Sequence, residues 1–123
     1  MKLDPDLIKR ILTAIEETKE DTALANESSI KKTGISFGEL TYHLRQLIQG
    51  GYINGEINYR HHGKIDWYIQ GLTWKGHDFV ANSKNDTLWN KAKTTVASKS
   101  VGISVDLLSE VLKKLVSGAA FLS

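Results

Sequence analysis

The sequence predicts a mainly α-helical fold with one small β-hairpin. Apolar residues recur at helical spacing in five segments, whereas they alternate in only one region, between residues 52 and 69. The helix before that region ends in Gly50-Gly51 and leads directly into the hairpin. This order is typical of a winged helix-turn-helix. We therefore expect a single domain, with such a core over 1–84 and a helical extension over 85–123.

The composition is that of an ordinary globular domain, and it excludes several classes of protein. The chain has 123 residues, of which 41% are hydrophobic and 24% are charged. Cysteine is absent, which excludes a disulfide framework and thiolate metal sites. No apolar run is long enough to span a membrane, and the polar, acidic start of the chain does not fit a secretory signal. We therefore expect a cytoplasmic protein.

The net charge of +2, with histidine neutral, is only mildly basic. Nonspecific nucleic-acid binders usually carry more positive charge, so this value permits DNA binding without arguing for it. The distribution is uneven, because residues 1–21 carry four basic and six acidic side chains, whereas residues 72–100 carry five and two. The acids of the first segment keep a protein-interaction role open.

Two helix starts carry capping residues. Asp4 precedes Pro5 and opens a helix over about 4–20. Its apolar stripe consists of Leu7, Ile8, Ile11, Leu12 and Ile15. Ser36-Phe37-Gly38-Glu39 is a capping box, and Gly50-Gly51 ends the 36–50 helix that it opens. Residues 21–35 give a weaker pattern: a short helix, or a short strand near Ile30, would fit, and the segment is expected to be mostly irregular.

The remaining elements follow in a regular order. Two β-like runs flank Arg60-His61-His62-Gly63-Lys64, a polar turn of hairpin length. Thr73 is expected to cap a helix over 74–82, and Asn85 or Asp86 the helix after it. Ser104 starts the last helix, 104–117. Its apolar stripe consists of Val105, Leu108, Val111, Leu112, Leu115 and Val116.

Two segments carry a resemblance to bacterial winged-helix repressors. The run from Tyr42-His43-Leu44 to Gly51-Tyr52-Ile53 resembles the end of the recognition helix in many of these proteins. Leu72-Thr73-Trp74-Lys75-Gly76 is similar to the Leu-Thr-x-x-Gly segment that follows their hairpin. Together and in this order, the two segments favour the winged-helix fold.

The whole chain also resembles an uncharacterised bacterial and prophage family, a domain of unknown function. The matching segments are Asp6-Leu7-Ile8-Lys9-Arg10-Ile11-Leu12, Tyr42-His43-Leu44, residues 72–79 and Asp86-Thr87-Leu88-Trp89. The resemblance implies a winged-helix-like core with a C-terminal helical extension, and it carries no catalytic residues. Members of that family often have Ala-Gly-Leu-Ile where this chain has Gly50-Gly51-Tyr52-Ile53, and we still expect Tyr52 to begin the hairpin.

The outer face of the 36–50 helix supplies candidate DNA contacts. The residues expected to face bases or backbone are Thr41, Tyr42, Arg45 and Gln49, and Arg and Gln suit guanine and adenine edges respectively. The candidate phosphate contacts are Lys31, Lys32, Arg60 and Lys64. A solvated helix face and an ordinary polar turn are the alternatives, and Glu39 would repel phosphate. We predict a DNA-binding protein that acts as a dimer, such as a phage or mobile-element regulator.

The last helix has more apolar surface than a helix on one side of a small core needs. Its predicted contacts with a second copy or another protein are Leu108, Val111, Leu112 and Leu115. A homodimer would match palindromic DNA. Packing against Leu7–Ile15 within the same chain is an equal alternative. The alternative function is a winged-helix module that contacts a host protein and binds no DNA.

Histidines and tryptophans are expected in structural roles. His43 and His77 should be buried and hydrogen-bonded, while the adjacent His61 and His62 would point to opposite faces of a strand and share no metal ion. The three tryptophans, Trp67, Trp74 and Trp89, are expected in the core. Because no phosphate-binding glycine loop, nucleophile elbow or recognisable carboxylate pair is present, we expect neither an enzyme nor a cofactor.

Overall fold

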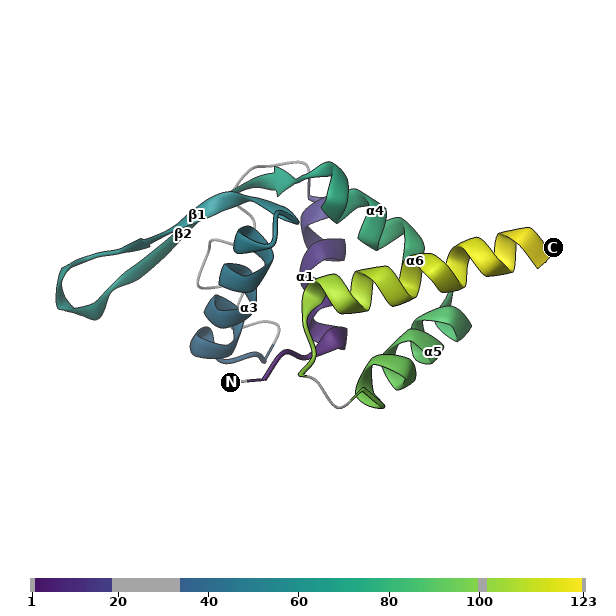
Figure 1. Cartoon of the computed structure of the whole chain (residues 1–123). Helices are drawn as coiled ribbons and strands as arrows, with labels where there is room; N and C mark the ends of the chain where they lie inside the picture. The colour runs from purple at the N-terminus through teal and green to yellow at the C-terminus, as the bar shows by residue number, and fades with distance from the viewer. Residues whose placement is uncertain (1, 19–33, 100–101, 123) are drawn as a thin grey trace.

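The computed structural model describes residues 2–18, 34–99 and 102–122, with side chains described as far as residue 118. In this part of the chain, five α-helices and one two-stranded sheet follow in the order α1, α3, β1, β2, α4, α5, α6. Figure 1 shows the helices gathered together and the hairpin projecting away from them. The predicted mainly helical fold with a small hairpin is confirmed. The expectation of an irregular segment over 21–35 falls almost wholly outside the described residues.

The first two described helices begin at the predicted caps. The Asp4 side chain accepts hydrogen bonds from two backbone N–H groups at the start of α1 (Pro5–Glu17). The Ser36 hydroxyl accepts one from the N–H of Glu39 at 3.2 Å at the start of α3 (Phe37–Gln49). α3 ends in a Schellman motif, in which the N–H of Tyr52 donates to the carbonyl of Leu47 at 2.9 Å. Of the predicted glycine pair, Gly50 is the C-cap and Gly51 is the left-handed residue, with φ +83°.

The hairpin consists of β1 (Ile53–Tyr59) and β2 (Ile65–Leu72), paired antiparallel with an irregularity between Asn54 and Gly55. The chain reverses through a short 3₁₀ turn, η1 (His61–Gly63), so the predicted hairpin turn is confirmed. Side chains alternate along both strands, and the inner face buries Trp67 and Ile69. This face lies toward α3 and determines how the hairpin sits on the helix.

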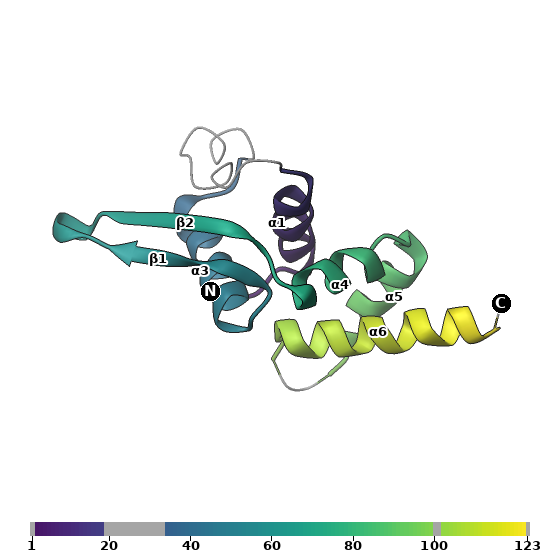
Figure 2. The same ribbon diagram turned by 90° about the horizontal axis from the view of Figure 1, so that it is seen from above.

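Three helices complete the chain, α4 (Trp74–Asn82), α5 (Asp86–Ala97) and α6 (Val105–Leu122). The side chains of Thr73 and Asn85 cap α4 and α5, as predicted. α6 continues to Leu122 rather than ending near residue 117, and its C-terminal end extends beyond α5 in both views (Figures 1 and 2).

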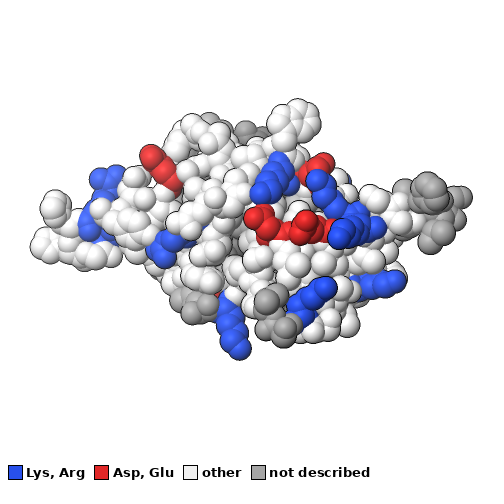
Figure 3. Space-filling model, in the orientation of Figure 1, with Lys and Arg blue, Asp and Glu red and all other residues white. Residues whose placement is uncertain are grey.

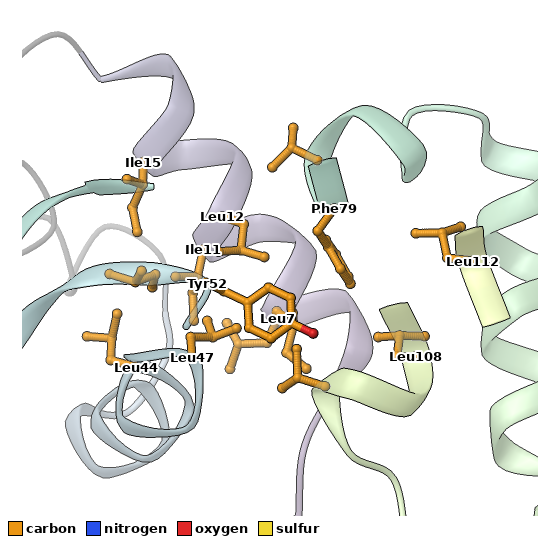
Figure 4. Close-up of a cluster of buried hydrophobic side chains, with 14 of the residues drawn as sticks. Leu7, Ile11, Leu12, Ile15, Leu44, Leu47, Tyr52, Phe79, Leu108 and Leu112 are labelled. Carbon is orange, nitrogen blue, oxygen red and sulfur yellow. The ribbon is translucent and has the colours of Figure 1, made fainter. Parts of the chain in front are cut away.

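One hydrophobic cluster joins the helices and the base of the hairpin. Figure 4 shows Leu7 and Leu12 of α1 close to Tyr52, which precedes β1. The ring of Tyr52 meets Phe79 of α4 edge-on, with centroids 6.2 Å apart. Leu108 of α6 belongs to the same cluster and is fully buried. The C-terminal helices therefore share their core with the segment that contains α3 and the hairpin.

The packing around Gly76 explains why the Leu-Thr-x-x-Gly segment has a glycine at its last position. The N–H of Thr73 donates to the carbonyl of Tyr52 at 3.1 Å, which brings the first turn of α4 against the end of the α3–β1 connection. A Cβ at Gly76 would overlap that same carbonyl oxygen. Glycine therefore permits a close approach of backbone to backbone at this point.

Trp67 and Trp89 lie in the core as predicted, but the prediction for Trp74 is wrong. Trp67 and Trp89 are 6% and 4% exposed, whereas Trp74 is 90% exposed. The buried residues of α4 are Gly76, Phe79 and Val80, which share one helix face. Trp74, two residues before Gly76, therefore points to solvent from the opposite side of the helix.

Both His43 and His77 were predicted to be buried and hydrogen-bonded. The prediction is confirmed for His43 and wrong for His77. His43 is fully buried and contacts Asp4 and Glu39 through its two ring nitrogens. The His77 side chain is 53% exposed, and its Nδ1 lies 3.3 Å from a carboxylate oxygen of Glu16. His77 directly follows the inward-facing Gly76, but its side chain lies at the edge of the contact between α4 and α1. It therefore remains partly exposed to water.

Candidate nucleic-acid interface

Three of the four predicted α3 side chains lie on the outer face of that helix. Tyr42, Arg45 and Gln49 are spaced three and four residues apart, so they form one stripe, called here the α3 stripe. Gln49 is exposed, and Tyr42 and Arg45 are half-buried. The opposite face packs Leu44 and Leu47 into the core and so determines which way the α3 stripe points.

The prediction that Thr41 faces DNA is wrong. Thr41 is 4% exposed, and its hydroxyl has no hydrogen-bond partner among the described residues. It lies one turn after Phe37, whose ring stacks on Trp67 of β2 with centroids 5.0 Å apart. Because its short side chain is buried on this side of α3, Thr41 cannot reach a base.

Arg45 contacts an aromatic residue of the hairpin. Its guanidinium carbon lies 5.5 Å from the ring centroid of Tyr59, the last residue of β1. Within the described ranges, Arg45 makes no ion pair with a carboxylate. Sequence reasoning assigned no role to Tyr59. One feature of the sequence could have indicated a role for Tyr59. It is an aromatic residue on the apolar face of the strand, but it lies at the end of the strand that is distant from the core.

The hairpin tip exposes four basic or titratable side chains, Arg60, His61, His62 and Lys64. Arg60 forms an ion pair with Asp66 of β2, so part of its charge is neutralised within the hairpin. In the described part of the chain, Lys64 has no such partner. Lys64 therefore supplies most of the positive potential at the tip when the histidines are neutral.

The other two predicted phosphate contacts, Lys31 and Lys32, lie outside the described residues. Figure 3 shows basic side chains both over the hairpin and α3 and over the helices α4 to α6, with acidic side chains among them on both parts. Charge alone therefore does not distinguish the α3 stripe and the hairpin tip from the rest of this face.

Two of the four predicted partner contacts on α6 are wrong. Leu108 and Leu112 are fully buried, because α6 packs them against the helices of its own chain. Val111 and Leu115 are half-buried. The solvent side of α6 carries Asp106, Glu110, Lys113 and Lys114, which are all exposed. Most of this apolar stripe is therefore buried within its own chain, but mainly against α5 rather than against Leu7–Ile15 of α1.

Asp106 joins α6 to the end of α3. Its Oδ1 accepts hydrogen bonds from the Tyr52 hydroxyl at 2.6 Å and from the Lys75 ammonium at 3.0 Å. Lys75 also donates to the carbonyl of Gly50, which caps α3, at 3.0 Å. Burial and then the bond to Asp106 raise the pKa of Tyr52. The bonds from Tyr52 and then Lys75 lower the pKa of Asp106. The ionised carboxylate thus holds the C-terminal end of α3 against the body of the protein.

Two further observations concern the described part of the chain. Over residues 2–18, 34–99 and 102–118, no three His, Asp or Glu side chains come together as a metal site requires. None of the helices described there has both the length and the apolar character needed to cross a bilayer.

Comparison with known proteins gives the chain a family. The family model described as "Hypothetical protein (DUF2513)" matches residues 2–102, from before α1 to beyond α5. The chain belongs to this family. A protein of Haemophilus influenzae (strain ATCC 51907 / DSM 11121 / KW20 / Rd), named "Uncharacterized protein", is 32% identical over 117 residues, covering 95% of this chain and 97% of that protein. No solved structure matches the chain significantly. The predicted resemblance to a family of unknown function is therefore confirmed, and that family is DUF2513.

Proposed function

We propose that this DUF2513 protein binds duplex DNA, with the α3 stripe in the major groove and the hairpin tip against neighbouring phosphates. The observation that carries the proposal is the position of α3, the helix that bears the α3 stripe, beside a hairpin that projects from the helical body (Figures 1 and 2). α3 and β1 are in contact, and Arg45 meets Tyr59 across that contact. A helix of this kind next to a β-ribbon fits the winged-helix mode of docking.

The few free positive charges on α3 and the hairpin predict that electrostatic attraction contributes little to the affinity for DNA. The ion pair of Arg60 with Asp66 leaves Arg45 and Lys64 as the main cations of α3 and the hairpin tip. Each neutralised phosphate adds about 0.9 to the slope of log K against log salt. Two or three phosphate contacts therefore predict a slope of about −2 to −3. Such a protein binds random DNA weakly and depends more on base contacts.

Fluorescence anisotropy of a labelled mixed-sequence duplex tests the proposal at low and near-physiological salt. Lys64→Ala should weaken binding and reduce the salt slope by about 1. Arg45→Ala should also weaken binding. Lys91→Ala is the matched control, because Lys91 is an exposed lysine on α5, away from the α3 stripe. No binding at low salt, or an equal effect of all three substitutions, would contradict the proposal.

A homodimer remains part of the proposal, with a regulatory role on phage or mobile-element DNA. The support is the half-buried state of Val111 and Leu115 and the extension of α6 beyond α5 (Figure 1). Light scattering after size-exclusion chromatography, over a range of concentrations, measures the mass directly. A monomer at every concentration, with and without DNA, would remove the dimer and leave the DNA-binding function to stand alone.

A further inference from the structure

We infer that Tyr59 is a positioning residue that holds the Arg45 guanidinium ready to read a guanine in the major groove. The inference rests on the DNA-binding function proposed above. It adds a specific base and makes base recognition depend on the hairpin as well as on α3.

The geometry joins a half-buried residue of α3 to an exposed residue of the hairpin. Arg45 lies in the middle of the α3 stripe, and Tyr59 pairs with Ile65 at the last register position before the hairpin tip. The distance of 5.5 Å from the guanidinium carbon to the ring centroid is within the range of a cation–π contact. Tyr59 is 61% exposed, so core packing does not account for an aromatic residue at this position.

The contact restricts an arginine side chain that would otherwise sample many rotamers. Arginine recognises guanine by donating two hydrogen bonds to O6 and N7. A guanidinium that meets a ring through its π-face keeps N–H groups at its edge for such a pair. Because part of the rotational freedom is already lost in the free protein, less entropy is lost when the base is bound. The ring therefore favours the base contact without touching the base.

A second hairpin tyrosine provides a matched control. Tyr68 is also a large exposed aromatic, at 40%, on the strand paired with β1. Side chains alternate along the strand, so Tyr68 lies on the face opposite the one that carries Trp67 and Tyr59. Removal of Tyr68 changes the aromatic content of the hairpin without removing the contact to Arg45.

Selection of binding sites from a random duplex library tests the inference. The full-length wild type would be compared with Arg45→Ala, Tyr59→Ala, Tyr59→Phe, Tyr68→Ala and the double variant of Arg45 and Tyr59. The wild type should enrich guanine at a defined position, and Arg45→Ala should lose that preference. Tyr59→Ala should reduce the preference about two- to fivefold, the size of an exposed cation–π contact. Tyr59→Phe and Tyr68→Ala should retain it, and the double variant should match Arg45→Ala alone.

Two readouts separate positioning from a general loss of structure or charge. Thermal unfolding should be the same for all Tyr59 variants, because the side chain is mostly exposed. The salt slope of Tyr59→Ala should equal that of the wild type, because no phosphate contact is removed. A guanine preference that is lost in Arg45→Ala but unchanged in Tyr59→Ala would overturn the inference and leave the proposed function intact. A selected motif without guanine would overturn it as well. Failure of the wild type to retain any duplex would overturn both.

Discussion

His43 of α3 accepts a hydrogen bond from the backbone N–H of Asp4 at 2.9 Å and so ties α3 to the N-cap of α1. An N–H group can only donate, so Nε2 of His43 carries no hydrogen and Nδ1 does. Nδ1 donates to the carbonyl of Glu39, 2.8 Å away. His43 follows Tyr42 directly, so this neutral, doubly bonded imidazole anchors the helix from which the α3 stripe projects.

We expect His43→Ala to lower the free energy of unfolding by about 2–4 kcal/mol, because it leaves both a cavity and an unpaired N–H at Asp4. Urea unfolding at neutral pH measures this change. His77→Ala is the control and should change stability by less than about 0.5 kcal/mol, since His77 is exposed. Equal effects of the two substitutions would show that the His43 bonds contribute nothing specific.

Gly76→Ala should destabilise the fold by about 1–3 kcal/mol, the usual cost of forcing an extra methyl group into a packed site. The new Cβ would overlap the Tyr52 carbonyl, and two backbones would have to separate. Gly118→Ala is the matched control, because no atom of the described residues lies within 4 Å of a Cβ there and the residue is inside α6. Helix propensity predicts that this control stabilises the protein by up to about 1 kcal/mol. Thermal melts of both variants should therefore shift in opposite directions.

Asp106→Asn should make the free energy of unfolding less dependent on pH in the acidic range. The pKa of Asp106 is lowered in the folded protein, so its carboxylate stabilises the fold above its usual pKa of 3.8. That contribution is lost as the pH falls through and below this value. The variant should be less stable than the wild type at pH 7, and the difference should shrink toward pH 3.

Chemical denaturation at a series of pH values measures the Asp106 effect. Asp86→Asn is the control, because the Asp86 side chain is 92% exposed. A constant difference between wild type and Asp106→Asn over the whole range would exclude a role for the charge of Asp106.

Trp74→Phe should remove most of the tryptophan emission that acrylamide quenches. Trp74 is 90% exposed, whereas Trp67 and Trp89 are protected in the core. Its stability should stay within about 0.5 kcal/mol of the wild type, as for other exposed positions. Stern–Volmer plots of the two proteins give the comparison. If quenching is unchanged by the substitution, Trp74 is covered in solution, for instance by a second copy.

Local signals were sufficient to predict the elements and their starts. Asp4, Ser36, Thr73 and Asn85 each accept a hydrogen bond from a backbone N–H two or three residues further along. Such contacts depend only on residues close in the chain, so the pattern of residue types predicts them. The glycine pair after α3 ends that helix for the same local reason.

The sequence by itself therefore determined the order of helices and hairpin and the outward position of Tyr42, Arg45 and Gln49. It also determined the boundaries of the elements to within a few residues, except at the end of α6. The tertiary structure decided which neighbour covers each face. It buried Thr41 beside the hairpin, turned Leu108 and Leu112 into the core and left Trp74 in water. It also brought Arg45 to Tyr59. Helical periodicity reveals that a face is apolar, but the width of the buried face and the partner of each side chain depend on elements distant in the chain.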